Sequence, residues 1–305
     1  MFAVVSQMAV MILGGVLWRL LSFGGWDADR ARTALTTLVY YLLLPALVLS
    51  VLWQAPLGLD SLRLALSAMV GVLAGLGLMA IWGRLVHLPR AQFGALLLAS
   101  GFPNATYLGL PVLESLFGDT GRTIAVQYDF FACTPLLLSL GILLAVRFGS
   151  NRGEAASPVR ALLRVPSLWA AALAVVLNLA AVPYPDWLAS VLERLAAGVV
   201  PIMLIALGMS LHLSALRPGA LLQVSPAIVI QLALMPAVVL ATASTLGLSG
   251  TLLAGTVLEA AMPVMVLGLV LCDRYGLDTS LYATTATAST LLALLTLPLW
   301  HGLLV

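Results

Sequence analysis

The sequence carries very little charge and contains no lysine. Only 9% of its 305 residues are Asp, Glu, Lys or Arg, and all 14 basic residues are arginine. The arginines stand singly in short polar segments, so no basic patch exists and we expect no nucleic-acid partner. Apolar residues fill the chain instead, at 62% of the total with a mean hydropathy of +1.11. This composition excludes a soluble globular protein and predicts an all-α polytopic membrane protein surrounded by lipid.

Cysteine and histidine are equally scarce. Cys133 and Cys272 lie far apart, and the three histidines stand at the ends of apolar segments. Neither the number nor the spacing of these residues predicts a disulfide framework, a metal site or a cofactor. The first residues lack the positively charged start of a cleaved signal peptide, so we expect the first apolar run to remain a membrane helix.

Ten apolar segments approach the ~20 residues that a helix needs to cross a bilayer. They cover roughly residues 3–21, 34–53, 62–82, 92–117, 123–146, 167–183, 188–210, 221–245, 250–271 and 281–300. Eleven arginines lie in the connections after odd-numbered segments, and only Arg63, Arg122 and Arg194 lie after even-numbered ones. The positive-inside rule therefore places the odd connections in the cytoplasm and both termini outside.

The two halves of the chain look like copies of one another. A polar connection at 147–166 separates residues 1–146 from residues 167–305, each with five apolar segments. Three pairs of prolines recur with offsets of 156, 160 and 163 residues: Pro45 and Pro201, Pro103 and Pro263, and Pro135 and Pro298. Chance is the alternative, because proline is common in membrane helices. Since five is odd, the second copy must cross the membrane upside down, which predicts two inverted five-helix repeats.

Helices 4 and 9 are expected to be broken at mid-membrane and to cross there. Pro103 lies near the middle of its segment, in the run Ser100-Gly-Phe-Pro-Asn-Ala-Thr-Tyr-Leu-Gly-Leu-Pro111, and Pro263 occupies the matching place in the second half. Proline removes a backbone donor and clashes with the preceding turn. Backbone groups freed inside a bilayer must be satisfied by protein or by a water-filled cavity. A break lined with hydroxyl and amide groups therefore indicates a binding site.

The run Asn104-Ala-Thr-Tyr-Leu-Gly-Leu-Pro111 resembles the Asn-x-x-aromatic-Leu-Gly-Leu-Pro signature of the auxin efflux carrier family. Ala261-Met-Pro263 and Tyr275-Gly-Leu-Asp278 resemble its C-terminal pattern. The likeness covers the whole chain and is greatest to the bacterial members. It implies a permease of the bacterial inner membrane for a small organic anion, such as a dicarboxylate or an auxin-like acid. It also implies a fold like that of the bile-acid symporters, in which helices 1, 2, 6 and 7 form a scaffold, often dimeric, and helices 3–5 and 8–10 form a moving core.

Asn104 is the leading candidate for substrate binding. It follows Pro103 at the start of a half-helix, which suits an N-cap, and the N-terminus of a half-helix attracts a carboxylate. The alternative is a cap that serves only its own helix. Ser100 and Thr106 flank it, and each hydroxyl could equally bind its own helix. Met262, Pro263 and Val264 are expected to lie opposite these residues, across the crossing.

Glu259 is the first candidate for ion coupling and Asp129 the second. Glu259 lies one turn before Pro263, at the C-terminal end of a half-helix, where burial and the helix dipole both disfavour a charged carboxylate. A proton, or less favourably sodium, would remove the penalty and link transport to an ion gradient. The alternative is a carboxyl group that is permanently neutral and hydrogen-bonded to a neighbouring helix.

Two other functional classes are less well supported. An intramembrane enzyme would need a second catalytic group at membrane depth, and none is found, so we expect no enzyme. A passive channel or facilitator remains the alternative, although a channel should repeat like residues around a pore, whereas the polar residues here concentrate at two breaks.

Overall fold

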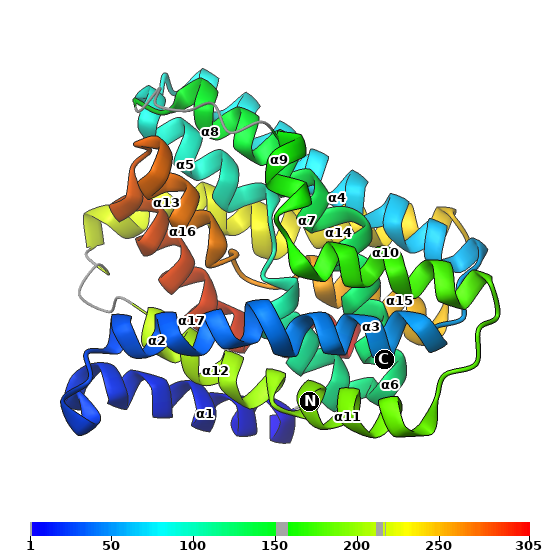
Figure 1. Cartoon of the computed structure of the whole chain (residues 1–305). Coiled ribbons are helices and arrows are strands. Elements are labelled where there is room, and N and C mark those ends of the chain that lie inside the picture. Colours follow the sequence, from blue (N-terminus) through cyan, green and yellow to red (C-terminus); the bar gives the residue numbers. More distant parts are fainter. Residues whose placement is uncertain (1, 151–157, 212–215, 217) are drawn as a thin grey trace.

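Helices account for nearly all of the chain that the computed structural model describes, which is residues 2–150, 158–211, 216 and 218–305 (Figure 1). Part of the predicted connection at 147–166 therefore lies outside the described residues. The helices, in chain order, are α1 (Phe2–Leu21), η1 (Phe23–Gly25), α2 (Ala28–Leu38), η2 (Val39–Leu43), α3 (Leu44–Gln54), α4 (Leu59–Leu85), α5 (Arg90–Gly101), η3 (Ala105–Gly109), α6 (Leu110–Tyr128), η4 (Asp129–Cys133), α7 (Thr134–Leu136), η5 (Leu137–Gly141), α8 (Ile142–Phe148), α9 (Pro158–Leu163), α10 (Pro166–Leu179), α11 (Asp186–Ala197), α12 (Val199–Ser210), α13 (Pro218–Val229), η7 (Ile230–Leu234), α14 (Met235–Thr245), α15 (Gly250–Ala260), α16 (Leu267–Tyr275) and α17 (Thr279–Leu304).

Several of these helices join end to end into stretches that are long and apolar enough to cross a membrane. Six such stretches are found among the described residues: Ala28–Gln54, Leu59–Leu85, Ala105–Phe148, Asp186–Ser210, Gly219–Thr245 and Thr279–Leu304. Shorter apolar helices cover Ser6–Leu21, Pro166–Leu179 and Gly250–Ala260. The expectation of an all-helical polytopic membrane protein is confirmed for the described part of the chain.

The stretch Ala105–Phe148 contains the two helices that the sequence predicts here, but a single residue joins them in place of the expected loop. This residue is Gly118, whose φ of +59° is not helical. A residue with a Cβ is strained at this φ, and glycine is not. Three residues later, Gly121 packs directly on the carbonyl group of Leu113, where a Cβ atom would overlap. The two halves of α6 can therefore lie against each other at the turn.

Proline explains where the helices widen. Of the five π-helical segments in the described chain, four end two residues before a proline: η2 before Pro45, η3 before Pro111, η4 before Pro135 and η7 before Pro236. The proline ring would clash with the carbonyl group four residues earlier. A π turn adds one residue to the turn and moves that carbonyl group away. The helix thus continues through each of these prolines, and the extra residue changes the direction in which the side chains before the proline face relative to those after it.

The helices pack in two groups (Figure 1). In the first group, α1 runs along α12 and α3 runs along α10. Gly15 of α1 and Gly208 of α12 face each other so closely that a Cβ on either would overlap the other helix's backbone. In the second group, α4 packs on α14 and α5, and α6 packs on α15. The breaks near Pro103 and Pro263 meet inside this second group.

Asn178 joins α10 to the end of α3. Its side-chain amide donates to the carbonyl groups of Leu52, Trp53 and Ala55 at 3.2, 2.7 and 2.8 Å. The Trp53 indole in turn donates to the carbonyl group of Val182 at 3.0 Å. Interhelical hydrogen bonds of this kind stabilise membrane bundles by ~0.6 kcal/mol each on average. Asn178 is therefore an interhelical contact.

Candidate functional site

The two breaks pair with each other through their backbones. Residues 102–104 separate α5 from η3, and residues 261–266 separate α15 from α16. The Asn104 N–H donates to the carbonyl group of Pro263 at 2.7 Å, and the Met265 N–H donates to that of Phe102 at 3.0 Å. Pro103 and Val264 thereby form a short antiparallel bridge. Each break satisfies backbone groups of the other, which is what a non-helical segment at membrane depth requires.

Side chains from three positions hold the second break. The Gln231 amide donates to the carbonyl group of Met262 at 3.0 Å, and the Tyr282 hydroxyl donates to that of Met265 at 2.6 Å. The Ser289 hydroxyl accepts from the Val264 N–H at 3.1 Å. The backbone groups that Pro263 frees are therefore held by residues of η7 and α17, which fixes this break in place.

Asn104 caps the half-helix that begins at Ala105. Its side-chain oxygen accepts from the Tyr107 N–H at 3.2 Å, while its side-chain nitrogen has no hydrogen-bond partner among the described residues. The residue is only 2% exposed. A buried donor without a partner costs ~1–3 kcal/mol. The side-chain oxygen of Asn104 therefore serves as the cap, and its side-chain N–H groups stay unpaired among the described residues.

A cavity of about 220 Å³ lies beside Asn104, between the two groups of helices. Its volume corresponds to about seven water molecules at ~30 Å³ each. Both polar and apolar side chains line it. The polar side chains are Tyr40, Asn104, Thr106, Tyr107, Asp129, Thr134 and Ser167, and the apolar ones are Val39, Leu44, Phe130, Leu137, Leu138, Val165, Met203, Met265, Leu267 and Leu271. No arginine or histidine is among them.

Asp129 lies on the same wall as Asn104. It begins η4, the π-helical segment before Pro135, and is 3% exposed. Its carboxyl group accepts hydrogen bonds from two hydroxyls, those of Thr106 and, at 2.8 Å, Thr134. Thr106 therefore links the start of the half-helix to this carboxyl group.

The cavity takes in two of the seven residues that the sequence nominated for substrate binding. Asn104 and Thr106 line it. Ser100 is fully buried and donates to the carbonyl group of Leu96 at 2.8 Å, so its hydroxyl serves its own helix. Pro103, Met262, Pro263 and Val264 form the paired breaks behind the wall and do not line the cavity.

Comparison with known proteins shows the family of the chain. The family model described as membrane transport protein matches residues 1–301. The chain belongs to this family. The resemblance to auxin efflux carriers, which are members of the same family, is thereby confirmed.

Curated relatives carry the same description. An uncharacterized transporter of Methanothermobacter thermautotrophicus is 31% identical over 307 residues, covering 99% of this chain and 97% of the relative. One of Methanocaldococcus jannaschii is 27% identical, covering 77% and 75%. One of Escherichia coli K12 is 25% identical, covering 69% and 68%. The protein is a membrane transporter.

Glu259 of this transporter lies away from the cavity. It is fully buried on the last turn of α15, directly against Gly109, and neither carboxyl oxygen has a hydrogen-bond partner among the described residues. Tyr128 and Gln231, also fully buried, have side-chain oxygens that lack partners too. Placing an isolated carboxylate in such surroundings costs several kcal/mol or more, so this arrangement suits a carboxyl group that holds a proton.

Some residues of the cavity wall carried no clear signal in the sequence. Tyr107 belongs to the family-like motif but was not nominated, and Tyr40 and Thr134 were not nominated either. Tyr40 lies in η2 and Thr134 directly follows η4, so π-helical turns set which way both residues face. The prolines two positions after η2 and η4 are the only local hint. Among the described residues, no three His, Cys, Asp or Glu side chains come together as metal ligands.

Proposed function

We propose that this protein is a secondary active transporter that binds a small organic anion at Asn104. One observation supports this proposal above all: Asn104 lines the cavity at the N-terminus of the half-helix η3–α6, and its buried side-chain nitrogen has no hydrogen-bond partner among the described residues. Free N–H groups and the positive end of the helix dipole favour a carboxylate there.

The cavity favours an acid with one carboxyl group and an apolar body. Apolar side chains outnumber polar ones in the lining, and no positive side chain among them could pair with a second carboxylate. Burying an unpaired carboxylate against such a wall is costly. Among the anions expected for this family, an aromatic or branched monocarboxylate fits better than a dicarboxylate.

Coupling to a proton follows from Asp129. A carboxylate substrate held by Asn104 would share the cavity wall with this carboxyl group. Two like charges in a poorly solvated site repel, so binding the anion favours protonated Asp129. Glu259, which does not line the cavity, is the second candidate, and sodium is the less favoured ion.

The architecture proposed is ten membrane spans in two inverted repeats, with both termini outside the bacterial inner membrane. Packing supports it: the pair α1–α12 joins spans 1 and 7, and the pair α10–α3 joins spans 6 and 2. In two five-span repeats, span 1 corresponds to span 6 and span 2 to span 7, so exchanging the halves turns the pair of spans 1 and 7 into the pair of spans 6 and 2. We take the first group of helices as a scaffold, through which two copies dimerise, and the second as a core that moves against it to alternate access.

Replacing Asn104 by serine tests the site. Serine keeps an oxygen that can cap the half-helix and lacks the amide donor. Exchange of labelled phenylacetate, indole-acetate or 2-oxoisocaproate in proteoliposomes should weaken about 10- to 100-fold in KM, as expected when a hydrogen bond to a charged group is lost. Ser100→Ala is the matched control and should exchange like wild type, because Ser100 serves only its own helix.

Unchanged exchange in Asn104→Ser would contradict the proposed site. Exchange of none of the three acids by the wild-type protein would contradict the proposed substrate class. A carrier should also show uptake that is accelerated by substrate on the opposite side. Absence of this acceleration, with unitary currents, would favour the channel alternative.

A further inference from the structure

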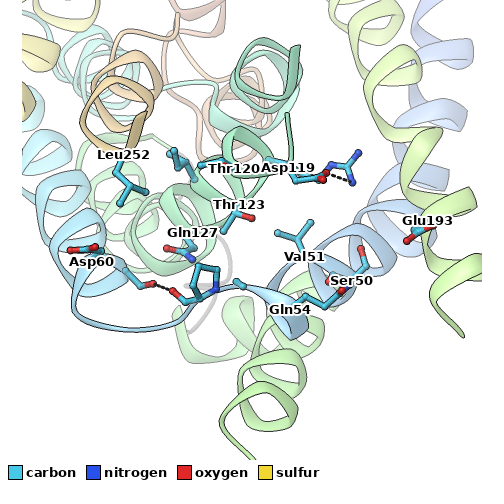
Figure 2. A pocket seen from close by; sticks show the side chains of 15 residues that line it. Ser50, Val51, Gln54, Asp60, Asp119, Thr120, Thr123, Gln127, Glu193 and Leu252 are labelled. Carbon is cyan, nitrogen blue, oxygen red and sulfur yellow. Dashed lines mark hydrogen bonds and ion pairs between the residues drawn. The ribbon is translucent and has the colours of Figure 1, made fainter. Parts of the chain in front are cut away.

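A second, larger cavity lies on the other side of the crossing (Figure 2). Its volume is about 470 Å³, and its wall comes from α3 and α11 in the first group of helices and from α4, α6 and α15 in the second. The cavity near Asn104 borders residues 39–44 and 129–138, and this one borders residues 50–56 and 119–127. The two cavities therefore lie at opposite ends of one interface between the groups. We call the second one the Gly118-side cavity, after the turn at Gly118. The arginine pattern predicts that this turn lies on the outer side of the membrane.

Uncharged polar side chains line the Gly118-side cavity on two facing helices. Thr120, Thr123 and Gln127 are spaced i, i+3 and i+7 on α6, so they share one face of that helix. Ser50 and Gln54 are spaced i and i+4 on α3. Figure 2 shows Thr123 and Gln127 on one side of the open space and Ser50 and Gln54 on the other.

Gln127 is the last residue of this row of polar side chains along α6. It is 4% exposed, and its amide makes no hydrogen bond to any of the residues that the structure describes. Buried side-chain amides are nearly always hydrogen-bonded to protein or water. The Gln127 amide, which lines the cavity without a partner among the described residues, is therefore open to water or to the polar end of a ligand.

The charges around the cavity do not favour holding an anion tightly. Arg122 pairs with Glu114 and lies 3.8 Å from Asp119, and Arg63 pairs with Asp60 at 2.9 Å. Glu193 lines the cavity without an ion pair among the described residues. Both guanidinium groups are thus engaged, and carboxylates outnumber them. An anion that enters finds only neutral donors and a negative surrounding potential.

We propose that the Gly118-side cavity is a second, weaker binding station for the transported anion, in which the Gln127 amide and the Thr123 hydroxyl hold its carboxyl group. This inference rests on the proposed function of the Asn104 site. The two stations differ in strength, because the Asn104 station adds the positive end of a half-helix and the Gly118-side station adds surplus carboxylates. The second station therefore releases the anion on the Gly118 side.

Sided transport kinetics test this inference. The probe is the fastest-exchanging of phenylacetate, indole-acetate and 2-oxoisocaproate, in proteoliposomes whose orientation is read from labelling of a Ser150→Cys site. Gln127→Leu keeps the side-chain volume and removes both amide groups. We expect the KM for entry from the Gly118 side to rise about tenfold, with the KM for entry from the Ser150 side unchanged. Gln7→Leu, on the exposed face of α1, is the matched control and should change neither value.

Two further variants keep the inference falsifiable if Gln127→Leu folds poorly. Thr123→Val should raise the same one-sided KM by about threefold. Glu193→Gln should lower it by about twofold at low salt and leave it unchanged at high salt, because the carboxylate acts through a screened charge. Equal effects on both sides, or none on either side, would overturn the second station. A loss of exchange by wild type itself would instead count against the proposed function.

Discussion

Asn104 and Asp129 place opposite chemistry on one wall of the cavity. The Asn104 nitrogen is a donor without a partner among the described residues, whereas the Asp129 carboxyl group already accepts from the hydroxyls of Thr106 and Thr134. An anion needs the donor and is repelled by the carboxylate. In the proposed coupling, a single proton on Asp129 removes this conflict, so that the proton and the anion bind together. The same proton would be lost when the anion leaves.

Asp129→Asn should separate exchange from accumulation. Asparagine is a neutral isostere, so counterflow of labelled phenylacetate, or of the best alternative acid, should survive. Accumulation driven by an imposed pH gradient in proteoliposomes should disappear, because the variant has no proton to release. Glu259→Gln is the comparison, and it should still accumulate substrate, because Glu259 does not line the cavity. The opposite result, with coupling lost only in Glu259→Gln, would move the proton site to Glu259.

The sequence predicted the helix break and the cap at Asn104 because the relevant rules are local. A proline at mid-segment predicts a break, and an asparagine directly after it predicts a cap; both are found. The sequence ranked Glu259 above Asp129 because position along a segment gives depth in the membrane but not the direction in which a side chain faces. Facing depends here on the π-helical turn η4, which adds a residue to the ordinary helical period. The sequence did not nominate Gln127, because no local pattern shows that a helix distant in the sequence leaves a cavity opposite this residue.

At the scale of the elements, prolines adjust helix faces and glycines set helix distances. The π-helical turns before Pro45 and Pro135 rotate Tyr40 and Asp129 toward the cavity from two different helices. Hydrophobic periodicity alone predicts neither the rotation of helix faces by prolines nor the close helix packing at glycines. The sharp turn at Gly118 was likewise expected as a loop, because a glycine within an apolar run does not reveal its φ angle.

Neighbouring glycines on α1 provide a stability test of the helix packing. Gly15 lies against the backbone of α12, so Gly15→Ala should push the helices apart and destabilise the protein by ~1–3 kcal/mol, the usual range for overpacking. A methyl group on Gly14 would meet no other atom within 4 Å, so Gly14→Ala should be neutral or slightly stabilising, because alanine favours helix. Thermal unfolding in detergent measures both. Equal melting temperatures for the two variants would contradict the close α1–α12 packing.

At the scale of the whole molecule, the two halves exchange partners in a reciprocal way. Helix α1 packs on α12 and α10 packs on α3, while the breaks of the two halves pair with each other at the centre. A reciprocal pattern of this kind is expected when two similar units are related by a two-fold axis in the membrane plane. Such a relation requires an odd number of spans in each half, and hence opposite orientations for equivalent connections.

Cysteine labelling from one side of the membrane tests that requirement. Cys133 and Cys272 are both fully buried, so the native chain should give little background with an impermeant thiol reagent. Ser150 and Ser249 are exposed, and three of the ten proposed spans separate them. Ser150→Cys should therefore react only from the cytoplasmic face. Ser249→Cys, and a cysteine appended after Val305, should react only from the outer face, because two further spans return the chain to the same side.

Labelling of Ser150→Cys and Ser249→Cys from the same face would mean an even number of spans between them. The second half could then not be an inverted copy of the first, and the Gly118-side and Asn104 cavities would lose their assignment to opposite sides of the membrane. In a third outcome, Ser150→Cys would react only from the outer face and Ser249→Cys only from the cytoplasmic face. The inverted repeat would then stand, but the proposed direction of release would be reversed, because the surplus carboxylates around Glu193 would face the cytoplasm. The two outcomes test separately the proposed symmetry, which the helix packing supports, and the proposed orientation, which only the arginine pattern supports.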